Sequence, residues 1–140
     1  MDFLLEFETI MAKSSTIALA TSVDNSPNVR IVVFYHDNRD NKILYFPTLK
    51  DSKKTVEFSQ NEKVSFTTIP GETNGVVRVC NARVQKSKKT VDEIKDGIIN
   101  KAPGFANMVA NSRSMMEIYE IHFSEAVDTV GNVNTSKITL

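Results

Sequence analysis

The sequence predicts a mainly β domain with helices (α+β), in which about six strands form a small antiparallel barrel. Two observations favour this fold class. Most strand-like segments follow one another through short, turn-rich connections, and only a few helical segments separate them. A doubly wound parallel sheet is disfavoured, because it needs a helix between nearly every pair of strands. We interpret residues 1–140 as one domain, since the chain can bury its own core and contains no linker or repeat.

The helical segments are predicted from apolar spacing and capping signals. Apolar residues at helical spacing predict an amphipathic helix over residues 2–12, and a second helix is predicted over residues 51–60. Thr90 and Glu93 have the spacing of a capping box, which predicts a third helix behind them. A short helical segment is predicted at 105–110.

The strands are predicted from short apolar segments between turn signals. They are "STIALATSV", "VRIVVFYH", "KILYF", "KVSFTTI", "VVRVCNARVQ", "MMEIYEIHF" and a further short segment, "AVDTV". The second of them, residues 29–36, is apolar on both faces, which predicts a central strand or one covered on both sides. The loop "DNRDN" is predicted to turn this strand back onto "KILYF" as an antiparallel hairpin.

Composition limits the function classes. Lys and Arg together number 17 and so do Asp and Glu, so the net charge is zero and we expect no nucleic-acid partner. Cys80 is the single cysteine, which fits a reducing compartment. The N-terminal segment lacks the basic flank and long apolar run of a secretory signal, and no stretch reaches the roughly 18 apolar residues of a membrane span. We therefore expect a cytoplasmic protein with no membrane partner.

The predicted hairpin brings one arginine close to the second helix. If residues 37–41 form the loop, opposed positions sum to roughly 76–78, so Arg30 lies opposite Phe46, Pro47 or Thr48. An arginine inside an apolar strand needs a counter-charge or an open strand end. The next polar groups along the chain are those at the helix start, so we expect Arg30 to lie near them.

The start of the second helix carries positive charge where negative charge is normally favoured. Ser52, Lys53 and Lys54 place a hydroxyl and two ammonium groups there. Together with Arg30 and Thr48 they predict a phosphate pocket. Micromolar affinity needs about 8 kcal/mol of binding free energy, which contacts to a phosphate alone would not supply. Burial of an apolar part of the ligand must therefore supply the rest.

A simpler interpretation of this cluster stays open. A Ser-Lys-Lys sequence at a helix start is often a solvated surface turn, and Arg30 can pair with Asp51. The sequence contains neither a P-loop nor a G-x-G-x-x-G motif, so the usual nucleotide fingerprints do not support the pocket.

The stretch "IALATSVDNSPNVRIVVFYHDNRDNKILYFPTLKDSKKTVEF" resembles the first half of the pyridoxamine 5'-phosphate oxidase-like, FMN-binding split-barrel proteins. Members commonly show a strand ending in A-T-V, a turn with G-x-P, a strand that opens with Arg, and a later Y-F-x-T-x-x-x-S-x-K. The order and spacing of these motifs match over residues 16–60. The segments "KVSF" and "VVRVCNARV" continue the resemblance loosely.

The resemblance implies a six-stranded antiparallel split β-barrel that binds FMN in a groove at the interface of a homodimer. The arginine and the Ser-Lys-Lys sequence would hold the phosphate, three aliphatic residues would lie along the isoalloxazine ring, and a phenylalanine and a threonine would border the flavin. These implied FMN-binding residues are Arg30, Ile31, Val32, Val33, Phe46, Thr48, Ser52, Lys53 and Lys54.

Two departures from the family pattern limit the predicted activity. Val76 stands where many relatives have a flavin-contacting glutamine, and "VNTSKITL" has no counterpart of the arginine–histidine substrate motif of true pyridoxamine phosphate oxidases. We therefore expect a flavin-dependent oxidoreductase that acts on another small molecule or electron donor. The alternative is a binding or sensing module that holds flavin, haem or a deazaflavin without turnover.

No catalytic residue can be assigned from the sequence. His36 and His122 are the only histidines, so no metal site is expected. His36 lies beside a turn and is expected to be solvated. Cys80 is interpreted as a small buried strand residue.

Overall fold

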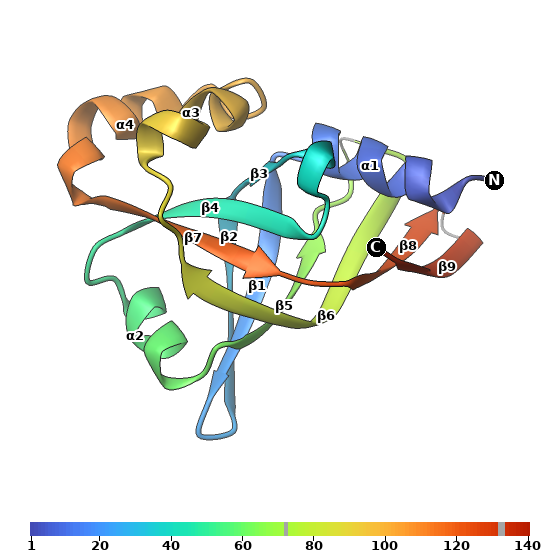
Figure 1. Ribbon diagram of the computed structural model, residues 1–140, viewed down its shortest axis with the longest axis horizontal. Coiled ribbons are helices and arrows are strands. Elements are labelled where there is room, and N and C mark those ends of the chain that lie inside the picture. The colour runs from blue at the N-terminus through green and yellow to red at the C-terminus, as the bar shows by residue number, and fades with distance from the viewer. Residues whose placement is uncertain (72, 132–133) are drawn as a thin grey trace.

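A computed structural model describes residues 1–71, 73–131 and 134–140, and this part of the chain forms a nine-stranded antiparallel sheet with helices packed around it (Figure 1). The strands are β1 (Thr16–Val23), β2 (Ser26–Val33), β3 (Tyr35–His36), β4 (Ile43–Leu49), β5 (Lys63–Thr68), β6 (Gly75–Lys86), β7 (Met116–His122), β8 (Glu125–Val130) and β9 (Asn134–Thr139). The helices are α1 (Phe3–Lys13), α2 (Lys53–Gln60), α3 (Val91–Ile99) and α4 (Phe105–Ser112), with 3-10 turns at Asn38–Asp40 and Arg113–Met115.

The strand order is β2-β1-β5-β6-β7-β4-β3, with β8 paired to β6 and β9 paired to β8. The long strand β6 joins the two halves of this sheet. Its first residues, 75–78, pair with β8, and its last residues, 83–86, pair with β7. The predicted α+β class and antiparallel architecture are therefore confirmed.

Two apolar clusters hold the elements together. The first fills the barrel interior and includes Phe34, Phe46 and Phe66. The second packs α3 and α4 against β4 and β7, with Ile98 and Phe105 among its buried members. Figure 1 shows these two helices together on one side of the sheet, away from α1.

The predicted helices are confirmed, with small changes at their ends. Residues 2–12 form α1, residues 51–60 contain α2, and α4 continues past the expected 105–110. Thr90 and Glu93 form the expected capping box at the start of α3. Periodicity and capping are local properties of the sequence, which is why these elements could be found without tertiary information.

The predicted strand count and one predicted pairing are wrong. The described chain has nine strands and not about six, because residues 125–130 form a full strand, β8, because β3 is separate from β2, and because the polar segment of β9 was missed. β2 pairs along its length with β1 and not with β4, so Arg30 lies opposite Leu19. Only β3 pairs with β4, through Tyr35 and His36.

A tight turn explains this pairing. Asp24 and Asn25 both have positive φ, 51° and 62°, and directly connect Val23 to Ser26. Two consecutive left-handed residues form the type I′ turn that favours a two-residue hairpin. β2 therefore begins at Ser26, three residues before the predicted strand of residues 29–36.

β2 is also not covered on both sides in the single chain. It lies at one end of the strand order, and Val29 and Ile31 are 63% and 59% exposed. Val32 alternates with them and is buried. The apolar character of both faces therefore leaves an exposed apolar strip on an edge strand.

An acidic side chain lies buried beneath α1. Asp128 of β8 is fully buried, and neither carboxylate oxygen has a hydrogen-bond partner within the described residues. Burial, and then the nearby negative charge of Glu6 on α1, raise the pKa of Asp128 to about 7. The folded state therefore holds this proton more tightly than the unfolded chain, whose ordinary pKa is 3.8.

Asp128→Asn should stabilise the fold at alkaline pH. Because the folded-state pKa of Asp128 is raised, its protonated carboxyl stabilises the fold. This contribution is complete below pH 3.8 and is lost as the pH rises through 7. Replacing the carboxyl group by a neutral amide should remove this loss, which is about 2–3 kcal/mol between pH 5 and pH 8, at about 1.4 kcal/mol per pH unit up to the folded-state pKa of about 7. Thermal melting at pH 5 and pH 8 measures the effect, with the exposed Asp24→Asn as control. An equal gain at both pH values would contradict the prediction.

Candidate functional site

A cavity of about 270 Å³ lies where β2, β4, α2 and α4 meet. Most of its wall is apolar, and one lysine and one threonine supply polar groups. The lining residues are Ile31, Val32, Val33, Pro47, Thr48, Leu49, Lys54, Phe105, Met108 and Met116. The cavity thus joins segments that are up to 85 positions apart in the sequence.

Five of the nine predicted site residues line this cavity. They are Ile31, Val32, Val33, Thr48 and Lys54. Ser52 lies beside it, because its Oγ is 3.1 Å from Oγ1 of Thr48. The strand and the start of α2 therefore come together, although the predicted hairpin register was wrong.

Phe46 and Lys53 have different surroundings. Phe46 is fully buried in the barrel core, where its ring lies 5.9 Å from that of Phe58. Lys53 is exposed and lines another pocket, which it shares with Glu57. Successive side chains of an α-helix point about 100° apart around its axis, so adjacent lysines at a helix start need not share a site.

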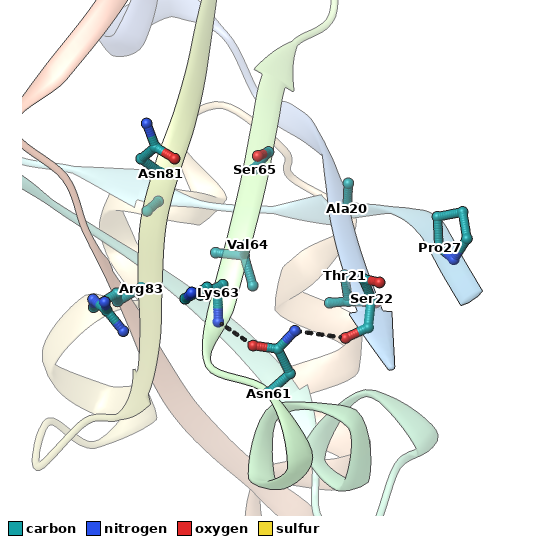
Figure 2. Close-up of a pocket in the computed structure, with 11 residues that line it drawn as sticks. Ala20, Thr21, Ser22, Pro27, Asn61, Lys63, Val64, Ser65, Asn81 and Arg83 are labelled. Carbon is teal, nitrogen blue, oxygen red and sulfur yellow. Dashed lines mark hydrogen bonds between the residues drawn. The ribbon is translucent and has the colours of Figure 1, made fainter. Parts of the chain in front are cut away.

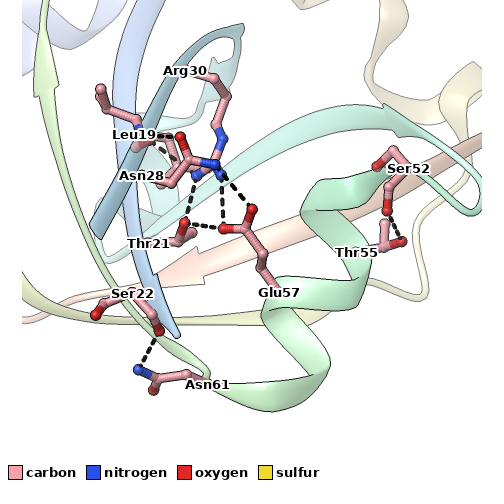
Figure 3. A network of polar contacts seen from close by, with 10 residues as sticks. Leu19, Thr21, Ser22, Asn28, Arg30, Ser52, Thr55, Glu57 and Asn61 are labelled. Carbon is pink, nitrogen blue, oxygen red and sulfur yellow. Dashed lines mark hydrogen bonds and ion pairs between the residues drawn. The ribbon is translucent and has the colours of Figure 1, made fainter. Parts of the chain in front are cut away.

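Arg30 points to the later part of α2 and not to its start (Figure 3). Its Nη2 donates to Oε2 of Glu57 at 2.9 Å, and its Nη1 donates to Oγ1 of Thr21 at 2.9 Å and to the carbonyl oxygen of Leu19 at 3.2 Å. The alternative prediction, a pairing of Arg30 with Asp51, is therefore wrong. The counter-charge is Glu57, which follows Ser52 by five residues. This separation corresponds to about 7.5 Å along a helix axis.

Glu57 accepts three hydrogen bonds. Oε2 accepts from Thr21 as well as from Arg30, and Oε1 accepts from Nδ2 of Asn28 at 3.0 Å. The bond from Thr21, followed by those from Asn28 and Arg30, lowers the pKa of Glu57 to about 2. The carboxylate is therefore ionised and held from three sides at neutral pH.

Lys54 carries a second positive charge close to Arg30. Burial, and then the charge of Arg30, lower the pKa of Lys54. The first turn of α2 contains no acidic residue, and the side chain of Ser52 does not cap the helix. Two neighbouring cations and a helix start without an acidic side chain favour a bound anion at this end of the cavity.

Sequence reasoning missed the residues that close the cavity from the far side. Phe105, Met108 and Met116 come from α4 and the start of β7. Their apolar character was visible in the sequence, but their position over β2 depends on how α3 and α4 pack. Glu57 was missed for a similar reason, because its partner Arg30 is 27 positions away.

A larger pocket lies elsewhere, on β1, β5 and β6 (Figure 2). It has a volume of about 670 Å³, and its polar groups include Asn61, whose Nδ2 donates to the carbonyl oxygen of Ser22 and whose Oδ1 accepts from the Lys63 N–H. These bonds are internal to the protein. No sequence signal indicated this pocket, and it contains none of the predicted FMN-binding residues.

The other candidates have structural surroundings. His36 is buried, contrary to the prediction, with Nε2 3.0 Å from the carbonyl oxygen of Asn41, and burial lowers its pKa. Cys80 is exposed and not buried as predicted. Within the described ranges, no group of three His, Cys, Asp or Glu side chains could hold a metal ion. None of the described helices has the length and apolar character needed to cross a membrane.

Several solved structures share this fold. ChuZ from Campylobacter jejuni has a TM-score of 0.77 at 13% identity; the match covers 98% of this chain but 59% of ChuZ. A protein described as FAD-binding, from Mesorhizobium loti, has a TM-score of 0.66 at 15% identity and coverages of 89% and 91%. A protein described as heme-binding, from Mycobacterium smegmatis, has a TM-score of 0.72 at 11% identity and coverages of 96% and 56%. At these identities the likeness shows the fold alone, a split barrel of mainly antiparallel strands with helices.

No curated protein matches the sequence. Residues 10–134, however, match the family described as pyridoxamine 5'-phosphate oxidase-like. This match covers most of the chain, including every residue that lines the cavity between β2 and α2. The protein therefore belongs to the pyridoxamine 5'-phosphate oxidase-like family.

Proposed function

We propose that the protein binds FMN in the cavity between β2, β4, α2 and α4 and acts as a flavin-dependent oxidoreductase on a small molecule. One observation carries this proposal. The cavity has an apolar wall from Ile31 to Val33 and a cationic end at Lys54, with Arg30 close by. A ligand that joins an aromatic ring system to a phosphate has this same polarity.

The residues fit the two parts of FMN. The strand residues Ile31 to Val33 would contact the ring system, while Phe105 and Met108 would exclude water from its other side. Lys54 and the paired hydroxyls of Thr48 and Ser52 would hold the phosphate, with the N–H groups at the start of α2. These assignments include most of the residues implied by the family resemblance.

FMN would supply the electron transfer, and the protein would supply its position and its electrostatic environment. The ionisable side chain in the cavity wall is Lys54, which we assign to anion binding and not to proton transfer. Val76 of β6 has an aliphatic side chain, so this position offers the flavin no side-chain amide. For this reason, and because the terminal substrate motif is missing, we propose a substrate other than pyridoxamine phosphate.

We further propose that the flavin site is completed in a homodimer. Val29 and Ile31 expose apolar side chains on β2, and Leu49 and Met108 add exposed apolar surface around the cavity. An exposed apolar surface on an edge strand is a common protein interface. A second copy that covers this surface would also close the cavity, since Ile31 belongs to both.

Haem is the alternative ligand, and one observation favours it. Met108 and Met116 line the cavity, and a methionine thioether can serve as an axial ligand of haem. The mycobacterial structural neighbour is also described as heme-binding.

The absorption spectrum of the purified protein tests the proposed cofactor, since flavin and haem have distinct visible bands. If the protein purifies without a chromophore, quenching of FMN fluorescence on titration provides the same test. Anaerobic addition of NADH or NADPH then tests turnover, because bleaching of bound flavin indicates a reductase. Binding of neither FMN nor riboflavin would overturn the proposal, whereas flavin binding without reduction by any donor would support a carrier or sensor.

Lys54→Ala should weaken FMN binding about 10–100-fold, the effect of losing one charge-assisted contact of about 1.5–3 kcal/mol. Riboflavin affinity should change little, since riboflavin lacks the phosphate. Lys53→Ala is the matched control, because this substitution removes the same charge and Lys53 lines a different pocket. Fluorescence titration of both flavins measures these affinities. Equal losses for FMN and riboflavin would show that Lys54 is not a phosphate ligand.

Ile31→Asp should disrupt the homodimer, because it places a charge on an apolar surface that the partner would bury. Analytical ultracentrifugation should show a shift to monomer, and flavin affinity should fall with it. Leu5→Asp on α1 is a control of similar exposure, since Leu5 is 56% exposed. A dimer that survives Ile31→Asp would place the interface elsewhere.

A further inference from the structure

The arginine next to the proposed phosphate site already binds a carboxylate, Glu57, which lines the neighbouring pocket together with Lys53. Glu57 occupies the space beside Arg30 and accepts hydrogen bonds from Arg30, Thr21 and Asn28 (Figure 3). A carboxylate oxygen and a phosphate oxygen use the same donors, and arginine binds either group through its planar fork. Glu57 therefore accepts from Nη2, a donor of Arg30 that an external anion would use.

This ion pair is well shielded from water. The side chains of Arg30 and Glu57 are only 17% and 13% exposed, whereas the Arg83–Glu62 pair is 58% exposed on both sides. Exposed pairs contribute little because water screens them, while a shielded pair with additional hydrogen bonds is difficult to separate. A ligand phosphate must therefore compete with an established contact.

Nη1 of Arg30 is engaged as well. Nη1 donates to Thr21 and to the carbonyl oxygen of Leu19, which fixes the plane of the guanidinium. Glu57 follows Lys54 by three positions on α2, so both side chains lie on neighbouring parts of one helix face. An anion bound at Lys54 would therefore lie near the negative charge of Glu57 as well as near Arg30.

We propose that Glu57 determines the selectivity of this site, as an internal carboxylate that competes with a ligand phosphate for Arg30. The inference rests on the proposed flavin site and concerns the class of flavin that it prefers. With Arg30 engaged, Lys54 and the start of α2 hold the phosphate, so FMN gains little over riboflavin. Removal of the charge of Glu57 frees Arg30 and increases this difference.

Glu57→Gln tests the proposal, because it keeps the shape of the side chain and removes its charge. FMN affinity should rise about tenfold, as expected for one freed charge-assisted contact, while riboflavin affinity stays within about twofold of the original. Both affinities are measured by fluorescence titration of the full chain, and thermal melting checks that the variant folds. Glu62→Gln is the matched control, since it removes the same charge from the exposed pair with Arg83 just beyond α2.

Several results would overturn the proposal. Unchanged or weaker FMN binding by Glu57→Gln would mean that Glu57 does not compete with the phosphate. An equal rise for riboflavin, or the same rise in Glu62→Gln, would mean that the effect does not act through Arg30. If Glu57→Gln does not fold, Asn28→Ala replaces it: the loss of one hydrogen bond to the carboxylate should raise FMN affinity by a smaller factor, and no rise would overturn the proposal.

The experiment also separates this inference from the proposed function. If the original protein binds FMN and Glu57→Gln binds it equally well, only the role of Glu57 is wrong. If neither protein binds FMN or riboflavin, the flavin site itself is wrong.

Discussion

The pairing of β2 with β1 is the constraint on which the site depends. Because alternate residues of a strand point to opposite faces, a shift of one residue would exchange every inward and outward side chain. The turn at Asp24 and Asn25 fixes the register with two left-handed residues and leaves no room for a slip. With this register Arg30 points toward α2, and Ile31 points outward to the exposed apolar surface.

The same register shows how far the sequence could predict the molecule. Helices α1 and α3 follow from local spacing and from the capping box, and they are found where expected. The partner of Arg30 could not be found in this way, because it depends on how α2 packs against β1. Cys80 is different, since simple alternation with the buried Val77 and Val79 places it outside. Its exposure could have been predicted from the sequence pattern.

The candidate site was only partly predictable for similar reasons. The family resemblance indicated the strand residues and Lys54, which line one cavity. It did not separate Lys53 from Lys54, because that distinction depends on the direction of each side chain around α2. The resemblance also gave no information on the apolar wall from α4, since its quoted segments end at residue 84. The support for the flavin proposal is therefore the lining of the cavity and the family match, and it does not require a contact between Arg30 and the start of α2.

The local charge explains why Glu57 matters for the choice of ligand. Arg30 and Lys54 contribute two positive charges at this end of the cavity, and Glu57 contributes one negative charge. A phosphate monoester carries about −1.5 to −2 charges at neutral pH, so it exceeds the remaining single positive charge. The helix start compensates for part of this excess, with a dipole equivalent to about half a charge. The site as folded therefore balances a monoanion better than a dianion, and full neutralisation of a phosphate requires Glu57 to leave Arg30 or to lose its charge.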